Sequence, residues 1–434
     1  VIGVGLMVAL PVWGYDNEVQ QAGYLFKDAY ERDTAVWELA DSETSLWQVF
    51  DEEFVTDQYG GLAFISALIY RFLSPDAHRP YLVLMVSSFA FAYGIPFFYS
   101  AVKQRFDAKL ALIASWIIVL YPEGIFYTVS QMREPFMIGG AMVLLWGILR
   151  WQEASQRRKI LLVCIPTAIV MAVISWLMFG AVLLVLGGWF AIDWIQNKLP
   201  SGKKKYGYLT LCLVILFGLA AFAFISREWL RFTIWWDMRE MLLTSGHIEI
   251  MVQGLPVPVQ YAVITVYGVL QMVPPAALIE TSAPLWKVIS VLRSVGWYLF
   301  LPLLLYGGVA LWKKDQRKER ILLAWLLLFT WGWTIFASLR AGGDSWDNPR
   351  YRMLALPIMA LLVVWFWRNR GHWLWRIAAI EVFAMAIFTH WYLARYAGWF
   401  RMIPLTTMIG VILGVAILTL ASGIWRELRQ RKTT

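Results

Sequence analysis

Apolar residues along this chain gather in long runs that are separated by short polar and charged stretches. Many runs approach the 20 residues that an α-helix needs to cross a bilayer core. Because a helix satisfies its own backbone hydrogen bonds in lipid, the pattern predicts an all-α polytopic membrane protein. The predicted spans are 1–13, 80–102, 108–122, 134–151, 160–175, 177–194, 208–226, 287–312, 321–338, 353–367, 373–394 and 404–424.

Clusters of Lys and Arg follow many of these runs, and such loops stay on the cytoplasmic side of a membrane. Twelve crossings place all of the clusters on that side without conflict. We therefore expect one transmembrane domain over residues 1–426 and a cytoplasmic tail at 427–434, in the inner (cytoplasmic) membrane of a cell. The clusters lie at 103–109, 157–159, 203–205, 313–320, 368–370 and 426–432.

Two apolar segments do not fit this alternation. Residues 59–73 are short for a span, so we expect a juxtamembrane helix that lies at the interface. Residues 259–278 are long enough to cross, but a single crossing would place the next basic loop outside. This segment, which contains Pro274 and Pro275, is therefore predicted to be re-entrant or interfacial.

Three loops of note fall on the non-cytoplasmic side, where any chemistry is expected. The first, 14–79, includes the juxtamembrane helix, and its residues 14–58 hold twelve of the 29 acidic residues. The second, 227–286, is the longest, and the third, 339–352, is short and marked by Gly and Pro.

Composition excludes several classes of protein. Hydrophobic residues make up 60% of the 434 positions and charged residues 15%, too apolar for an ordinary soluble core. The net charge of +9 is carried by loops between spans, which indicates topology and not nucleic-acid binding. Cys164 and Cys212 lie in apolar runs and are expected to be small hydrophobic residues. The chain begins with Val and a short apolar run, which predicts that several residues precede it; a cleaved signal peptide is the weaker alternative.

No HExxH, GxSxG or Walker-type motif is present in the sequence. Zinc proteases, serine hydrolases and nucleotide-hydrolysing enzymes are therefore poor interpretations. A membrane enzyme that uses no nucleotide needs an activated substrate that is already in the lipid.

Carboxylates of the first outer loop are candidates for chemistry. Asp16 and Glu18 follow the first span in the sequence GYDNE and could act as a general base or as metal ligands. A solvated acidic loop is the alternative. Asp57 precedes the juxtamembrane helix, where it is either a second carboxylate of the same site or only a helix cap.

Arginines at the ends of predicted spans are candidates for binding phosphate, because a guanidinium binds phosphate in a bidentate way. Arg133 and Glu134 stand at the outer entry to the fourth span, and function and a structural ion pair are equally open there. In the third outer loop Arg350 and Arg352 flank Tyr351 and could grip a phosphate head group or simply anchor the chain.

These elements and their order resemble the membrane-embedded GT-C glycosyltransferases related to protein O-mannosyltransferases and the lipid A aminoarabinose transferase. In that family an acidic motif closes the first span, as Asp16 and Glu18 do here. The first outer loop then ends in an acid followed by Pro-Pro and a short helix. Asp57 supplies the acid, but Gly60 and Gly61 replace the prolines.

Two further elements resemble the same family. SQMREP places Arg133 and Glu134 at the head of the fourth span, and NPRYRMLALP resembles an NPRY-like element that precedes an inward span. The resemblance covers mainly residues 1–150 and 340–367, and the middle of the chain is generic membrane sequence.

The resemblance implies an inverting transferase that moves a sugar from a polyprenyl-phosphate carrier to a protein, lipid or glycan acceptor on the outer face. It implies Asp16 and Asp57, with Glu18, as catalytic carboxylates, and Arg133, with Arg350 or Arg352, as the donor phosphate site. A divalent metal ion, Mg or Mn, held by Asp16 and Asp57 is an alternative means of stabilising the phosphate charge.

Other classes of function remain open. An outer-face polysaccharide polymerase or ligase would use the second outer loop instead, including His247, the one histidine predicted well outside the membrane on that side and a further candidate for substrate binding. A transporter or lipid flippase would need ionisable residues deep within spans, such as Glu381. A non-catalytic scaffold is the third alternative. The arginines of the second loop are Arg227, Arg231 and Arg239.

Overall fold

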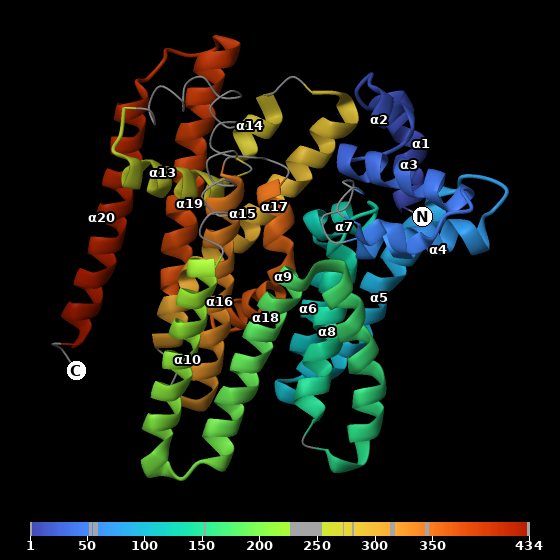
Figure 1. Cartoon of the computed structure of the whole chain (residues 1–434). Helices are drawn as coiled ribbons and strands as arrows, with labels where there is room; N and C mark the ends of the chain where they lie inside the picture. Colours follow the sequence, from blue (N-terminus) through green and yellow to red (C-terminus); the bar gives the residue numbers. More distant parts are fainter. Residues whose placement is uncertain are drawn as a thin grey trace. The chain divides into compact units, whose positions relative to one another are not determined.

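The described part of this computed structural model is built from helices (Figure 1). Within that part, eight helices are long and apolar enough to cross a membrane, or nine if one bent pair counts as a span. The chain is therefore a polytopic helical membrane protein, which confirms the predicted fold class, while the number of twelve spans stays a prediction. The described residues are 2–51, 54, 60–151, 153–225, 254–271, 273–279, 282–312, 317–342 and 347–431.

The chain forms two compact units. One consists of Val1–Gln271 and Leu328–Leu361, and the other of Met272–Leu327 and Leu362–Thr434. All contacts of the candidate site described below lie within the first unit.

The helices of the first unit are α1 (Ile2–Trp13), α2 (Glu18–Gln21), α3 (Lys27–Asp41), η1 (Leu46–Phe50), α4 (Gly61–Leu73), α5 (Pro80–Arg105), α6 (Ala108–Leu120), α7 (Pro122–Thr128), α8 (Glu134–Arg150), η2 (Ala154–Gln156), α9 (Arg157–Lys198), η3 (Ser201–Lys203), α10 (Lys204–Ile225), α13 (Val257–Leu270), α17 (Asp347–Arg352) and η4 (Met353–Ala355). The helices of the second unit are α14 (Pro274–Ile279), α15 (Pro284–Trp312), α19 (His372–Tyr392), η5 (Leu393–Ala397) and α20 (Leu405–Arg431). Two more, α16 (Arg317–Ala341) and α18 (Leu356–Arg368), run through the boundary between the units.

The long helix α9 is interrupted at Ser175, whose backbone is extended (φ −163°, ψ 94°). An unbroken helix of its 42 residues would be about 63 Å long, roughly twice the thickness of a bilayer core. Figure 1 shows the chain reversing direction within α9. The break therefore falls where the sequence predicts the boundary between the spans 160–175 and 177–194.

The helices α6 and α7 meet at a bend of 58°. Tyr121 leaves the helical conformation there, and Pro122 begins α7, where its missing N–H costs no hydrogen bond. The bend leads the chain from α6 through α7 into the buried turn 129–133, which precedes α8 and carries part of the candidate site.

Close packing of α5 against α8 fixes the start of α8. A Cβ atom on Gly139 would lie 2.1 Å from the backbone oxygen of Ala90, so only glycine allows this approach. Small residues at a crossing let two membrane helices come close and gain van der Waals contact. This packing holds Glu134, the first residue of α8, in a fixed place.

The first loop folds as α3 packed on α4. The apolar side of α3 includes Val36 and Ala40, which form a buried cluster with Ala63 and Tyr70 of α4. The predicted juxtamembrane segment 59–73 is indeed a helix over its described residues, Gly61–Leu73. Its position at a membrane interface stays a prediction.

The segment 259–278 forms two helices that are separated at residues 271–273. The first, α13, has 14 residues and is about 21 Å long, which is short for a bilayer core of roughly 30 Å. Pro274 begins α14. The predicted re-entrant or interfacial position of this segment stays a prediction.

Candidate functional site

The carboxylate of Glu134 lies at the N-terminus of α8, and its residue is only 2% exposed. Pro135 follows it and suits the first helical turn, because a proline there forfeits no hydrogen bond. An acid in the first turn also complements the positive end of the helix dipole. Local sequence therefore both starts the helix and places a carboxylate at its buried end.

Arg350 of α17 is the partner of Glu134. Its Nε atom lies 2.7 Å from Oε1 of Glu134, and the two side chains are 7% and 2% exposed. The residues are 216 positions apart in the chain, yet both belong to elements that the sequence selects as candidates. The structure thus brings the head of the fourth predicted span and the third predicted outer loop together at one ion pair.

Two further charges act on this pair. Asp28 of α3 approaches Nη1 of Arg350 at 3.7 Å, with its own side chain 69% exposed. The positive charge of Arg133 also acts on the Glu134 carboxylate. We call Asp28, Arg133, Glu134 and Arg350 the ion cluster; its two acids and two bases come from α3, the end of α17 and the start of α8.

The second carboxylate oxygen of Glu134, Oε2, is buried and has no hydrogen-bond partner among the described residues. A buried charged oxygen is costly when it is unpaired, so such atoms usually mark a position where a water molecule, an ion or a ligand group belongs. The ion cluster therefore offers a buried acceptor next to two guanidinium groups.

Other residues of the third predicted loop hold helix ends together. Arg352, 2% exposed, donates hydrogen bonds to the backbone oxygens of Gln271 (2.6 Å) and Val269 (3.4 Å) at the end of α13. Cations that bind the last carbonyls of a helix stabilise its C-terminus. These contacts favour a structural role for Arg352.

Asn348 and Tyr351 are also engaged with the protein. The Asn348 side chain donates to the backbone oxygens of Gly268 (3.0 Å) and Gly342 (2.7 Å). The guanidinium of Arg340 lies 4.7 Å from the centre of the Tyr351 ring. Asn348 thus ties α13 to the end of α16, which orients α17 so that Arg350 can reach Glu134.

The carboxylates after the first predicted span lie at the surface. Asp16 is exposed and accepts a hydrogen bond from Gln21 (3.3 Å), and Glu18 accepts one from Tyr30 (2.7 Å). This bond raises the pKa of Tyr30. Among the described residues, neither carboxylate forms a hydrogen bond or an ion pair with the ion cluster.

Several candidates lie outside the described residues: Asp57, His247 and the arginines Arg227, Arg231 and Arg239. Within the described part of the chain, no group of three or more His, Cys, Asp and Glu side chains is placed to hold a metal ion. The predicted roles of these residues, and the predicted metal at Asp16 and Asp57, stay predictions.

A second buried cluster, centred on Asp33 of α3, is not among the sequence candidates. Asp33 is 1% exposed. Its Oδ2 atom accepts hydrogen bonds from the Tyr24 hydroxyl (2.5 Å) and lies 2.8 Å from Nε2 of His78, and its Oδ1 accepts one from Tyr70 (2.6 Å). We call these four residues the Asp33 cluster. Burial, followed by the charge of Asp33, raises the pKa of both Tyr24 and Tyr70.

The sequence does contain a signal for this cluster. The buried positions Ala29, Val36 and Ala40 of α3 recur at helical spacing, and Asp33 occupies the position between them on the same face. A charged residue on an apolar face needs a partner or a function. His78 lies two residues before the start of α5, far from Asp33 in the chain, and supplies such a partner.

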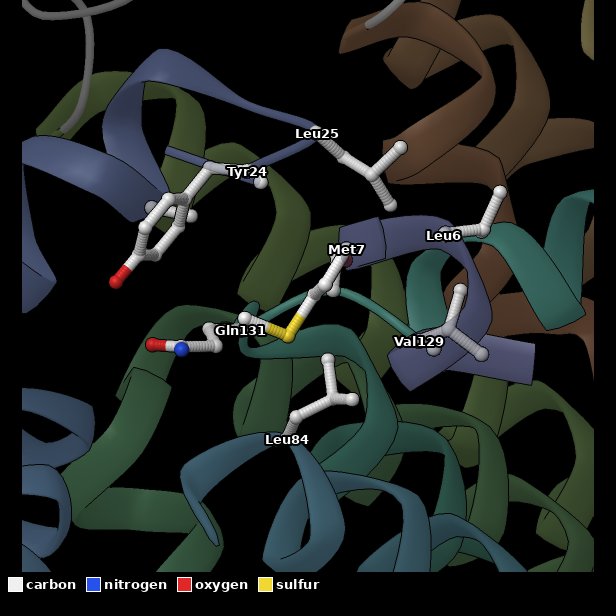
Figure 2. A pocket seen from close by; sticks show the side chains of 11 residues that line it. Leu6, Met7, Tyr24, Leu25, Leu84, Val129 and Gln131 are labelled. Carbon is white, nitrogen blue, oxygen red and sulfur yellow. The ribbon is translucent and has the colours of Figure 1, made fainter. Parts of the chain in front are cut away.

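A small pocket of about 20 Å³, enough for one water molecule, lies beside the Asp33 cluster. Figure 2 shows Tyr24 and Gln131 at one side of it and Leu6 and Val129 at the other. Its lining is mainly apolar. The pocket is therefore better described as a gap in the hydrophobic packing of α1 against α5 than as a substrate site.

No protein-family model, curated protein or solved structure matches this chain. The fold and the site together define a multi-pass helical membrane protein with a buried ion cluster at the ends of its helices.

Proposed function

We propose that the protein is a membrane glycosyltransferase of the GT-C type, which moves a sugar from a polyprenyl-phosphate carrier to an acceptor on the outer face of the cytoplasmic membrane. The observation that supports this proposal is the ion cluster. It joins Asp28, Glu134 and Arg350 from three separate segments that the basic loops of the sequence assign to the outer side.

The donor phosphate is proposed to bind at Arg350, beside Arg133. A guanidinium offers five N–H donors in a planar fork, which suits phosphate oxygens. The contact of Arg350 with Asp28 is long, 3.7 Å, and the Asp28 side chain is largely exposed. Exposed ion pairs contribute little stability. A donor phosphate, whose charge grows as the sugar leaves, would therefore displace Asp28 while Glu134 keeps Arg350 in place.

In the proposed reaction the acceptor oxygen attacks the anomeric carbon, and the bond between that carbon and the phosphate oxygen breaks. The phosphate leaves with the electron pair, and the sugar is transferred with inversion. Arg350 and Arg133 stabilise the charge that grows on the phosphate. Since the phosphate needs no proton to leave, an acid near the donor is not required.

The surface carboxylates Asp16 and Glu18 are proposed to act on the acceptor side, together with Asp57. Asp16 offers an exposed oxygen of the kind that Mg or Mn binds. Its expected partner Asp57 lies outside the described residues. The proposed reaction therefore includes no step at a metal ion.

The test is transfer of radiolabelled sugar from purified polyprenyl-phosphate hexoses to an envelope lipid extract. Arg350→Lys keeps the charge but loses the planar fork, and we expect it to weaken donor binding at least tenfold. The matched control is Arg370→Lys, because Arg370 is exposed and rests on Trp367. Equal donor binding by both variants would contradict the phosphate site.

Asp16→Asn tests the first-loop carboxylates in the same assay. Loss of transfer in a variant that elutes like the wild type in gel filtration is expected. If the wild type binds no polyprenyl-phosphate donor at all, the proposed function is wrong.

A further inference from the structure

We propose that His78 is the general base that takes the proton from the acceptor hydroxyl, and that Asp33 is its positioning residue. This inference rests on the proposed transferase function and names the group that activates the acceptor. It arises from the Asp33 cluster, which the donor phosphate site does not use.

The hydrogen bond to Asp33 determines where His78 carries its proton. A carboxylate only accepts, so Nε2 of the neutral ring donates to Oδ2 of Asp33 at 2.8 Å. Nδ1 then holds a lone pair. Nδ1 makes no hydrogen bond to the described residues. It is also not one of the buried side-chain atoms that lack a hydrogen-bond partner. The side chain of His78 is 29% exposed, so a hydroxyl can reach Nδ1 from outside.

Aromatic rings fix the orientation of the imidazole. The ring of Trp37 stacks on it at 5.1 Å between centroids, and the ring of Tyr70 meets it edge-on, also at 5.1 Å. A base is effective when its accepting atom is held in one direction, because less ordering is then needed during the reaction. His78 is held on both sides.

Among the described residues, Asp33 and Tyr70 are the titratable groups shown facing the ring of His78, and Tyr24 binds the same carboxylate. Of the arginines close in the chain to these residues, Arg79 donates to the Ser74 hydroxyl, and Arg32 donates to the backbone oxygen of Gln131.

The tyrosines act as neutral donors to Asp33, and this neutrality matters. Their raised pKa values keep Tyr24 and Tyr70 protonated, so neither tyrosine adds a negative charge beside the imidazole. A buried carboxylate that orients a histidine and stabilises its imidazolium is the arrangement that general-base catalysis uses.

Helix α3 connects this base to the donor side. Asp28 contacts Arg350, and Asp33 contacts His78, and the two acids are five residues apart on one helix. Five residues correspond to about 7.5 Å along the helix axis. At about 100° per residue the two acids also point about 140° apart around the axis, so the donor phosphate and the acceptor base lie on different faces of α3.

In the proposed step the acceptor O–H bond breaks, and its proton moves to Nδ1 of His78. The acceptor oxygen forms a bond to the anomeric carbon, while the carbon–oxygen bond to the carrier phosphate breaks and the phosphate keeps the electron pair. His78 later gives the proton to solvent.

The first experiment compares His78→Gln with the wild type in the full-length protein, using tritiated polyprenyl-phosphate hexoses and an envelope lipid extract. We expect transfer to fall about 10²- to 10⁴-fold, the usual contribution of a general base, with donor binding unchanged. His372→Gln is the matched control, because His372 is also paired with an acid, Glu427 at 3.2 Å, but is 54% exposed.

The pH profile separates a base from a structural residue. In the wild type, transfer should fall as the pH is lowered, because a protonated His78 cannot accept a proton. This acid limb should be lost in His78→Gln. In Asp33→Asn the amide can donate to Nε2, which moves the ring proton to Nδ1, so transfer should fall although His78 is present.

Added imidazole is the check for variants that fold poorly. His78→Ala leaves a slot beside Trp37 and Tyr70, and imidazole at millimolar concentration should restore part of the transfer there but not in Arg350→Lys. Unchanged transfer and an unchanged acid limb in His78→Gln would overturn the inference and leave the transferase function standing. A wild type whose transfer rate does not fall as the pH is lowered would overturn it too, whether or not the variants fold.

Discussion

Two buried carboxylates of the first unit are stabilised by different kinds of partner. Glu134 is held by a guanidinium, Arg350, and Asp33 is held by two hydroxyls and an imidazole. Removing one member of the first pair takes the closest opposite charge away from a buried group, which is costly even though Asp28 stays near Arg350 and Arg133 near Glu134. The ion pair is therefore the place where a single residue change should affect stability most.

Glu134→Gln should destabilise the protein by up to about 3–5 kcal/mol, because the buried Arg350 loses its close carboxylate partner and keeps the longer contact with the exposed Asp28. Arg350→Gln should cost a similar amount. The double variant should be clearly more stable than the sum of the single effects, since neither charge remains. Thermal unfolding in detergent measures this coupling, and Glu43→Gln, an exposed acid of the same loop, is the control. Additive effects would contradict a direct energetic link.

At the residue scale, the sequence selects candidates where a charged residue stands at a predicted span boundary. Glu134 and Arg350 were both selected, but their pairing was not, because 216 residues separate them and no local pattern records the contact. Asp28 and Asp33 were hidden among the acidic residues of the first loop. His78 is not a candidate from the sequence, since its role depends on a carboxylate of α3 that lies 45 residues away in the chain.

At the scale of elements, α3 is the helix that both clusters share, so its ends matter. Its last carbonyls have no partner within the helix. Arg71 of α4 supplies one, with hydrogen bonds to the backbone oxygens of Ala40 (3.1 Å), Leu39 (2.8 Å) and Ser42 (2.8 Å). A cation at this end also suits the helix dipole.

Arg71→Ala should therefore lower the stability of the first loop by about 1–3 kcal/mol, the range for hydrogen bonds to a charged group. Faster amide hydrogen exchange over the last turn of α3 would show that the helix end has loosened. Arg158→Ala, at an exposed basic position, should change neither exchange nor melting temperature. An Arg71 variant with wild-type exchange in α3 would show that the helix does not depend on this cap.

The helix α4 shows how far an element could be predicted. Its extent followed from the apolar run, because burial and period decide where a helix persists. The apolar run does not explain why Gly60 and Gly61 stand where the GT-C enzymes that the sequence resembles have prolines. Gly60 has φ +72°, which proline cannot adopt, and a Cβ on Gly61 would lie 2.3 Å from the backbone oxygen of Val173 in α9. These are tertiary contacts that no local pattern contains.

At the scale of the whole molecule, the number of spans depends on how short helices are counted. The predicted spans lie on helices, but α1 has 12 residues and α8 has 17, and the apolar run of α6 ends in a bend. Hydropathy locates such segments well. It does not decide whether a short or broken helix crosses the bilayer, because protein neighbours can cover what lipid would otherwise expose.

The break of α9 at Ser175 makes this count testable. If α9 is two spans, the loops before and after it lie on the same side; if it is one, they lie on opposite sides. In a protein with Cys164→Ala and Cys212→Ala, we expect Ser155→Cys and Ser201→Cys to react with a membrane-impermeant maleimide only after the cells are permeabilised. Glu43→Cys, in the first loop, should react in intact cells. All three positions are exposed.

The expected outcome follows from length. A 42-residue helix would exceed a bilayer core by about 33 Å, and the excess would expose Leu161, Leu162 or Leu183 to water, whereas two spans keep these exposed leucines in lipid. Opposite labelling of the Ser155 and Ser201 positions would show that α9 crosses once. The twelve-span alternation would then fail, and with it the placing of Glu134 and Arg350 on the outer side, so this measurement bears on the proposed site as well as on the fold.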